Sequence, residues 1–194
     1  CAGQVDPVNE SNSETVNTSG VAWANNGNEI GVGSGFTVQA EGALQGYPSQ
    51  LSVPQGGSLG IQVSSTLPSY TATVMREAPA TPAGGAVTVV SAASHTGRLQ
   101  LVKSGYRSNG CGWNTDFTVS VPATWQSGVY SVRLRSSLGK MFPVVFVVRP
   151  TVPANRVAVV IPVNTYNAYN TWGGHDQYTN GQDGQQRPIT LQRP

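Results

Sequence analysis

The sequence has few charged residues. They make up 10% of its 194 positions, against about 25% in an average soluble domain. Because surface helices normally carry Glu, Lys and Arg on their outer face, this scarcity argues against a protein built of long helices. The net charge is +2, and Lys and Arg are scattered singly, which excludes the basic patch that nucleic-acid binding requires. We therefore expect no nucleic-acid partner.

Long apolar runs are also missing. The longest, Met141 to Val148 and Val157 to Val163, are far shorter than the roughly 20 residues that a membrane-spanning helix needs. The sequence opens with Cys1 and a tail rich in Ser, Thr and Asn. This is typical of a mature bacterial lipoprotein, whose first cysteine carries a lipid, and is equally consistent with an arbitrary start. We expect a secreted or cell-surface bacterial protein that contacts a membrane only through a lipid on Cys1.

Motifs of the common hydrolases and zinc proteins are absent as well. No Gly-x-Ser-x-Gly segment opens a helix, and neither His-Glu-x-x-His nor Cys-x-x-Cys occurs. The two cysteines, Cys1 and Cys111, allow one disulfide or two thiols, and their number does not choose between these. His95 lies in a turn-like stretch without a nearby carboxylate, and we interpret it as a solvent-exposed histidine.

What the sequence does contain is a series of short β-branched stretches bounded by Pro and Gly. They begin at Tyr47 and have the spacing of a sandwich. Strands are predicted at residues 50–53, 58–64, 71–76, 86–92, 99–103, 116–121, 128–136 and 141–148. In one of them Tyr130, Val132 and Leu134 alternate with polar residues, as in an antiparallel strand with one buried face. The prediction is a mainly β fold, an immunoglobulin-like antiparallel sandwich.

Changes in composition divide the chain into three parts. Residues 1–44 are rich in Asn, Ser, Gly and Glu, and they are predicted to form an extended or partly ordered leader. Residues 45–150 form the predicted sandwich. Pro150 and Pro153 mark a boundary, because proline cannot continue a central strand. Residues 151–194 are predicted to begin an α/β domain or to form a docking segment.

The unbroken apolar run from Val157 to Ile161 is typical of a strand buried on both faces, as in a parallel α/β sheet. A loop rich in Asn, Tyr and Gly follows it. The residues after this run are too few to supply neighbouring strands and covering helices. Either the chain is one piece of a longer protein, or this segment docks on the sandwich or on a partner chain.

The densest group of chemically active side chains also follows this run. Within eighteen residues the sequence places Tyr166, Tyr169, His175, Asp176, Tyr178 and Asp183. Phenolate, imidazole and carboxylate ligands suit iron better than copper(I). A trivalent or strongly polarising metal can hold a tyrosine deprotonated although its ordinary pKa is near 10. The alternative is an aromatic docking loop in which the tyrosine rings pack and the hydroxyls form hydrogen bonds.

Four stretches of the sequence, in order, carry a family resemblance. They are residues 46–53 (GYPSQLSV), residues 111–113 (CGW) leading to Val121-Pro122, residues 125–130 (WQSGVY) with residues 146–149 (FVVR), and residues 161–174 (IPVNTYNAYNTWGG). Their order and spacing resemble the large (beta) subunit family of N,N-dimethylformamidase, and the resemblance runs from about Gly46 to the end of the sequence.

The resemblance implies a sandwich joined to a glutamine-amidotransferase-like α/β domain. It also implies hydrolysis of a C–N amide bond by a mononuclear iron that two tyrosines and a glutamate hold. Tyr169 matches the first ligand tyrosine within Ala-Tyr-Asn, and Tyr178 matches the second more loosely. Tyr166 is the competing residue. The residues expected around the ligands are Tyr166, Asn170, His175 and Asp183.

The sequence also departs from the family. The family's glutamate ligand lies well downstream of its tyrosines, and no glutamate follows Tyr169 here. Iron binding would therefore need the remainder of a longer chain or a second subunit. The competing hypothesis is a non-catalytic extracellular module, for example a surface or assembly subunit that self-assembles by strand addition at residues 157–161. Sugar binding through Trp23, Trp113, Trp125 or Trp172 is a further variant of this hypothesis.

Overall fold

The computed structural model describes residues 31–32, 36–37, 44–77, 86–103, 105–152, 158–170, 172, 177 and 189–194. The strands in these ranges are β1 (Gly31–Val32), β2 (Phe36–Thr37), β3 (Leu44–Pro48), β4 (Ser52–Pro54), β5 (Ser58–Ser65), β6 (Ser69–Arg76), β7 (Val87–Thr96), β8 (Thr115–Ser120), β9 (Gly128–Ser136) and β10 (Met141–Arg149). The helices are α2 (Tyr106–Asn109) and α3 (Val163–Tyr169).

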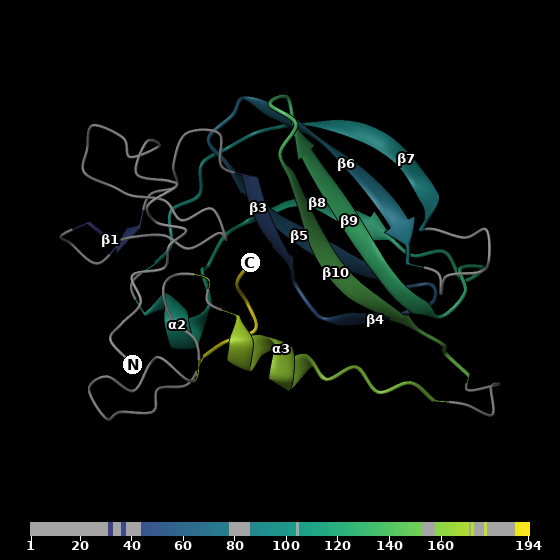
Figure 1. Cartoon of the computed structure of the whole chain (residues 1–194). Coiled ribbons are helices and arrows are strands. Elements are labelled where there is room, and N and C mark those ends of the chain that lie inside the picture. Colours follow the sequence, from purple (N-terminus) through teal and green to yellow (C-terminus); the bar gives the residue numbers. More distant parts are fainter. Residues whose placement is uncertain are drawn as a thin grey trace.

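Eight of these strands form two facing sheets (Figure 1). One sheet has the order β4-β10-β9-β6-β7, and the other has the order β3-β5-β8. Neighbouring strands are antiparallel except β4, which adds parallel to β10. Strands β1 and β2 pair separately.

This strand order is that of an immunoglobulin domain. Strands β3, β5 and β8 take the places of A, B and E, while β10, β9, β6 and β7 take those of G, F, C and C′. Tyr130, at the start of β9, donates its hydroxyl to the carbonyl of Gln126 at 2.7 Å, which is the tyrosine corner of such domains. The predicted mainly β, immunoglobulin-like sandwich is confirmed.

The main core lies between the two sheets. Alternate residues of each strand point into it, and the largest fully buried apolar side chains are Tyr130, Phe146, Ile61, Leu134, Val53, Val63, Val121, Val132, Val144 and Val148. Burying each such side chain contributes about 1.5–3 kcal/mol. The predicted inward face of β9 is confirmed, since Tyr130, Val132 and Leu134 all lie in this core.

A second, smaller cluster covers the other face of the three-stranded sheet. It contains Tyr47, Val102, Cys111, Trp113 and Trp172, with Tyr106 packed against it. Because side chains alternate along a strand, Tyr47 of β3 points away from the main core. Strand β3 is consequently buried at all five of its positions.

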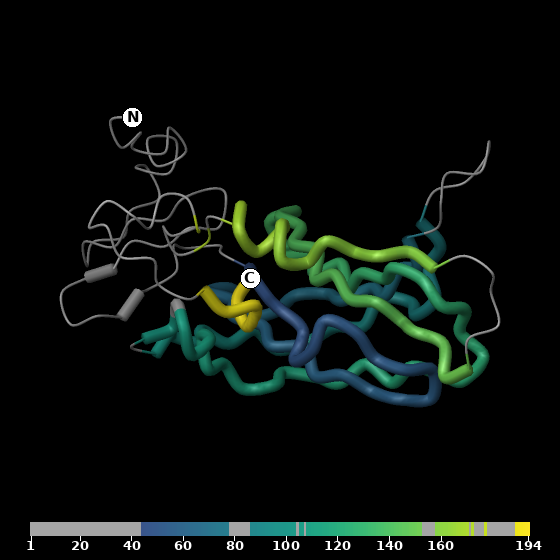
Figure 2. The backbone as a smooth tube through the Cα atoms, turned by 90° about the horizontal axis from the view of Figure 1, so that it is seen from below, coloured from purple at the N-terminus to yellow at the C-terminus, as the bar shows by residue number. Residues whose placement is uncertain are grey.

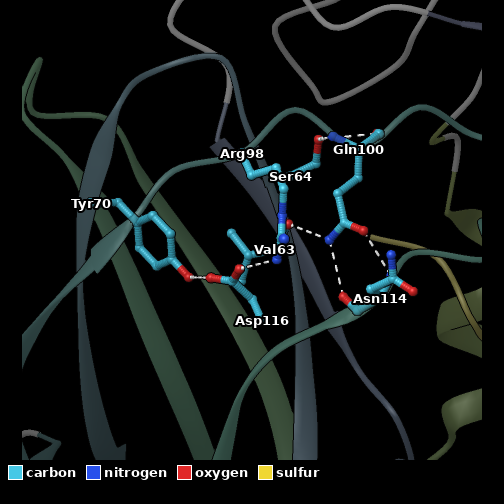
Figure 3. A network of polar contacts seen from close by, with 7 residues as sticks. All are labelled: Val63, Ser64, Tyr70, Arg98, Gln100, Asn114 and Asp116. Carbon is cyan, nitrogen blue, oxygen red and sulfur yellow. Dashed lines mark hydrogen bonds and ion pairs between the residues drawn. The ribbon is translucent and has the colours of Figure 1, made fainter.

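The strand predicted at residues 99–103 is absent. Residues 99–103 form no β-ladder with another strand. Instead, the side chain of Gln100 makes the hydrogen bonds that join this part of the chain to β5 and to Asn114 (Figure 3). Its Nε2 donates to the carbonyl of Val63 at 2.8 Å and to that of Asn114 at 3.0 Å, and its Oε1 accepts from the Asn114 N–H at 2.7 Å. The Ser64 hydroxyl also accepts from the Gln100 N–H at 2.8 Å.

The strand predicted at residues 157–161 is also wrong in its described part. After β10 the chain runs back along the sandwich (Figures 1 and 2), and residues 158–162 make no ladder. A strand needs a neighbour to take its backbone hydrogen bonds, and none of the described strands pairs with this run. Val159 is 79% exposed and Val160 is 88% exposed. The next residues form helix α3 where a loop is predicted.

Candidate functional site

Helix α3 presents two tyrosines on one exposed face. Tyr166 and Tyr169 are three residues apart, a spacing that places both on the same side of a helix, and they are 63% and 64% exposed. Asn167 and Ala168, which lie between them, are buried. The helix therefore packs through one side and leaves the two phenols accessible.

Trp172 joins this helix to the sandwich. Its side chain is 2% exposed, and its indole N–H donates to Gln45 Oε1 on β3 at 3.2 Å. Its ring meets Tyr106 and Trp113 edge-on, at centroid distances of 5.9 Å and 6.1 Å, which is a favourable aromatic geometry. The short stretch after α3 is thus fixed against the outer face of the three-stranded sheet.

The C-terminal segment, residues 189–194, lies beside α3 and the sandwich (Figures 1 and 2). The Cys111 N–H donates to the Gln192 carbonyl at 3.0 Å, and Asn167 Nδ2 donates to the Ile189 carbonyl at 2.9 Å. Arg193 is 5% exposed, and its guanidinium donates to the main-chain carbonyls of Asn170 and Trp172, just after α3. The sequence gives no local signal for this role of Arg193, because the helix and the arginine are far apart along the chain.

The described structure covers only some of the predicted site residues. Tyr166, Tyr169 and Asn170 are on or just after α3, whereas Tyr178, His175, Asp183 and Cys1 lie outside the described residues. The role of Tyr178 as the second ligand therefore stays a prediction, as do the two alternatives, one disulfide or two thiols, for Cys1 and Cys111. The Cys111 side chain itself is fully buried in the second cluster.

Asn170 shapes the turn that follows α3. Its Oδ1 accepts from the Trp172 N–H at 2.9 Å, and its Nδ2 donates to the Pro194 carbonyl at 2.8 Å. Both polar atoms of the amide are thus engaged with the protein backbone. In this structure Asn170 holds the chain around Tyr169.

The described residues supply one of the proposed iron ligands and do not complete an iron site. Tyr169 offers an accessible phenol, which is a hard oxygen donor that suits iron. Across the described ranges no three His, Cys, Asp or Glu side chains come together as a metal cluster.

The described helices include none that is long and apolar enough to cross a membrane.

A polar network links the two sheets at the start of β6 (Figure 3). The Tyr70 hydroxyl donates to Asp116, and Arg98 Nη2 lies 3.2 Å from the other carboxylate oxygen of Asp116. Burial, followed by the hydrogen bond to Asp116, raises the pKa of Tyr70.

The interpretation of His95 as solvent-exposed is wrong, because its ring is half-buried between Tyr70 and Phe117 at centroid distances of 5.3 Å and 4.2 Å.

Most of the described tryptophans are packing residues. Trp113 and Trp172 are buried in the second cluster, so neither offers a ring face for a sugar. Trp125 is half-buried and stacks on Tyr130 with an interplanar angle of 2°. Trp23 lies outside the described residues. Sugar recognition through Trp113 or Trp172 is therefore not supported.

Comparison with protein families gives a match over residues 80–194, from before β7 to the C-terminal segment. The matching family is described as N,N-dimethylformamidase beta subunit-like, C-terminal. The chain belongs to this family. Membership in the dimethylformamidase beta subunit-like family confirms the resemblance seen in the sequence, and the matched span includes α3 with both of its tyrosines. Comparison with curated proteins gives no match.

Proposed function

We propose that this chain contributes to an iron-dependent enzyme that hydrolyses a C–N amide bond. Membership in the dimethylformamidase beta subunit-like family carries this proposal. The reaction adds water across the amide bond and yields a carboxylic acid and an amine, and N,N-dimethylformamide is the substrate that the family's name indicates. Extracellular or cell-surface location remains part of the same proposal.

The exposed face of α3 supports a ligand role for Tyr169. A large aromatic side chain that is 64% exposed contributes little to the core, so packing in the core does not account for Tyr169. The helix is nevertheless anchored, because Asn167 and Ala168 are buried beneath it. An accessible phenol on an anchored element is what a metal ligand requires.

Tyr178 is the proposed second tyrosine ligand. The carboxylate would come from a longer form of the chain or from a second subunit. Such an iron, when bound, supplies Lewis-acid activation of the amide carbonyl and of water. The contribution of α3 is to hold the Tyr169 phenol at a fixed place on the surface of the sandwich.

Tyr169→Phe and Tyr166→Phe form a matched pair that tests the proposal. Both residues lie on α3 and are almost equally exposed. In the natural protein, Y169F should lose its iron and reduce amide hydrolysis about 100-fold or more, whereas Y166F should keep both within a few-fold. Elemental analysis measures the iron, and release of dimethylamine measures hydrolysis. If both variants retain full iron and activity, or if Y166F alone loses them, the assignment of Tyr169 is wrong.

One observation favours a second candidate function, assembly by strand addition. Strand β7 is an edge of the five-stranded sheet, and its ten residues include no Asp, Glu, Lys, Arg or Pro. Edge strands without such residues are prone to pair with other chains. A Val90→Lys variant should then abolish self-association measured by sedimentation velocity. A wild type that is monomeric at high concentration would exclude this function.

A further inference from the structure

Helix α3 lacks the usual local features that stabilise a short helix. It has seven residues, no side-chain hydrogen bond at its N-cap Pro162, and no basic residue in its last turn. Helices shorter than about 12 residues are marginal in water without tertiary contacts. Its last carbonyl groups also need hydrogen-bond donors that the helix itself does not provide. The helix must therefore be held by other parts of the chain.

Arg193 supplies one such donor to α3, at the Asn167 carbonyl, and two more to carbonyls of the turn just after the helix, from more than twenty residues away. Its Nη1 donates to the Trp172 carbonyl at 2.7 Å, and its Nη2 donates to the Asn170 carbonyl at 2.8 Å and to the Asn167 carbonyl at 3.3 Å. A cation at this position also offsets the partial negative charge at the C-terminal end of a helix. The planar guanidinium can serve three carbonyls at once, which a lysine ammonium cannot do in the same geometry.

The residues around Arg193 are tied to the sandwich on the opposite side. The carbonyl of Gln192 accepts from the Cys111 N–H at 3.0 Å. Gly110, which has a φ of +86°, packs so closely that a Cβ there would lie 2.9 Å from Gln192 Oε1. Arg193 therefore connects a segment held by the sandwich to the end of α3 that carries Tyr169.

We propose that Arg193 is the positioning residue that fixes the C-terminal end of α3, and with it the Tyr169 phenol, relative to the sandwich. The link to an iron ligand rests on the proposed function. The placement of Tyr169 by Arg193 does not depend on it. The guanidinium acts through the backbone of α3 and has no contact with substrate in this scheme.

The test compares Arg193→Lys and Arg193→Met with Arg135→Met in the natural protein. Arg135 is an exposed arginine on β9 and serves as the matched control. Hydrogen exchange of residues 163–170 reports on α3. The ¹⁹F resonance of fluorotyrosine at Tyr169, identified by its absence in Y169F, reports on the phenol without any metal. Circular dichroism shows whether the sandwich remains folded.

We expect R193M to speed exchange of α3 by at least about tenfold and to shift or broaden the Tyr169 resonance, while the sandwich stays folded. R193K should give a smaller effect, and R135M none. Unchanged exchange and an unchanged Tyr169 resonance in R193M would overturn the proposal, as would an equal response to R135M. If R193M unfolds the sandwich, R193K decides by the same two readouts.

Iron binding separates this inference from the proposed function. In wild type loaded with iron, the visible phenolate-to-iron absorption should weaken or shift in R193K and R193M. If wild type binds no iron, the proposed function fails, while the exchange and ¹⁹F results still decide the role of Arg193. If iron binds and its absorption is the same in all variants, Arg193 does not position an iron ligand and the link to the proposed function is overturned, while the exchange and ¹⁹F results still decide whether Arg193 places Tyr169.

Discussion

Replacing Trp172 should detach α3 and the C-terminal segment while leaving the sandwich folded. The Trp172 side chain is 2% exposed and belongs to the second cluster, which lies apart from the main core between the sheets. Its contacts reach Gln45, Tyr106 and Trp113, which all lie on the outer side of the three-stranded sheet. Its removal should therefore act on docking and only weakly on the packing between the sheets.

The size of the effect follows from the buried area. A tryptophan buries about 150–250 Å², which at about 25 cal/mol per Å² gives about 4–6 kcal/mol, and measured truncations of buried tryptophan to alanine cost about 3–5 kcal/mol. A loss of about 4 kcal/mol in Trp172→Ala lowers the ratio of docked to undocked chains about a thousandfold. Trp172→Phe keeps a ring and removes the N–H that Gln45 accepts, so it should cost about 1–3 kcal/mol.

Hydrogen exchange read by mass spectrometry separates docking from global stability. In Trp172→Ala, residues 163–170 should exchange far faster, while β9 and β10 keep the protection of wild type. Trp125→Ala is the matched control, because Trp125 stacks on Tyr130 at 5.1 Å within the sandwich. It should lower the global free energy of unfolding and leave docking intact. Equal loss of protection in α3 and in β9 on removal of Trp172 would show one cooperative unit and refute the reasoning.

Three further predictions concern the sandwich. Burial raises the pKa of Tyr47 to about 12, above its value near 10 in the unfolded chain. The stabilisation that the buried, protonated phenol contributes is therefore complete below about pH 10 and is lost as the pH rises towards 12. Urea titrations should show a smaller loss of stability over this range in Y47F, and an equal loss would contradict this. Gly97→Ala places a Cβ against the Leu67 carbonyl and should lower the free energy of unfolding by about 3 kcal/mol. In Gly139→Ala the new Cβ meets open space, so this variant should lose only about 1 kcal/mol, because of its φ of +79°. Equal melting temperatures of the two variants would refute this ranking. Gln100→Glu sets a buried carboxylate against two carbonyls, so it should lower the free energy of unfolding by about 3 kcal/mol at neutral pH. The loss should be smaller at about pH 4, where the carboxyl group is protonated and can donate. A loss of stability that does not depend on pH would contradict this.

The strands that the sequence predicts correctly are those whose pairing follows from their own pattern. In β9 the alternation of Tyr130, Val132 and Leu134 with polar residues gives the buried face directly. Even there, Ser131 is buried on the outer face, because its hydroxyl donates to Glu77 Oε1 at 2.5 Å. This polar contact depends on a residue more than fifty positions away, and an alternation pattern does not show it.

The elements that the sequence misses depend on distant residues. Strand β3 has the sequence LQGYP, with few β-formers, and it is stabilised because the second cluster covers its outer face. The stretch 99–103 looks like a strand, yet the Gln100 side chain makes the hydrogen bonds that a pairing strand would make. Helix α3 has the sequence VNTYNAY, in which Ala168 is the one strong helix former, and Arg193 contacts its end. In all three cases tertiary contacts override local propensity.

The route from the sandwich to α3 bears on where Tyr169 can lie. Residues 158–162 make no ladder, and Val159 and Val160 are 79% and 88% exposed, so packing of this connection does not determine the position of the helix. Trp172 and the segment that carries Arg193 both follow α3 in the chain and both contact its C-terminal end or the turn after it. The C-terminal end of α3, which carries Tyr169, is therefore held by residues that follow the helix in the chain and not by the exposed run that precedes it.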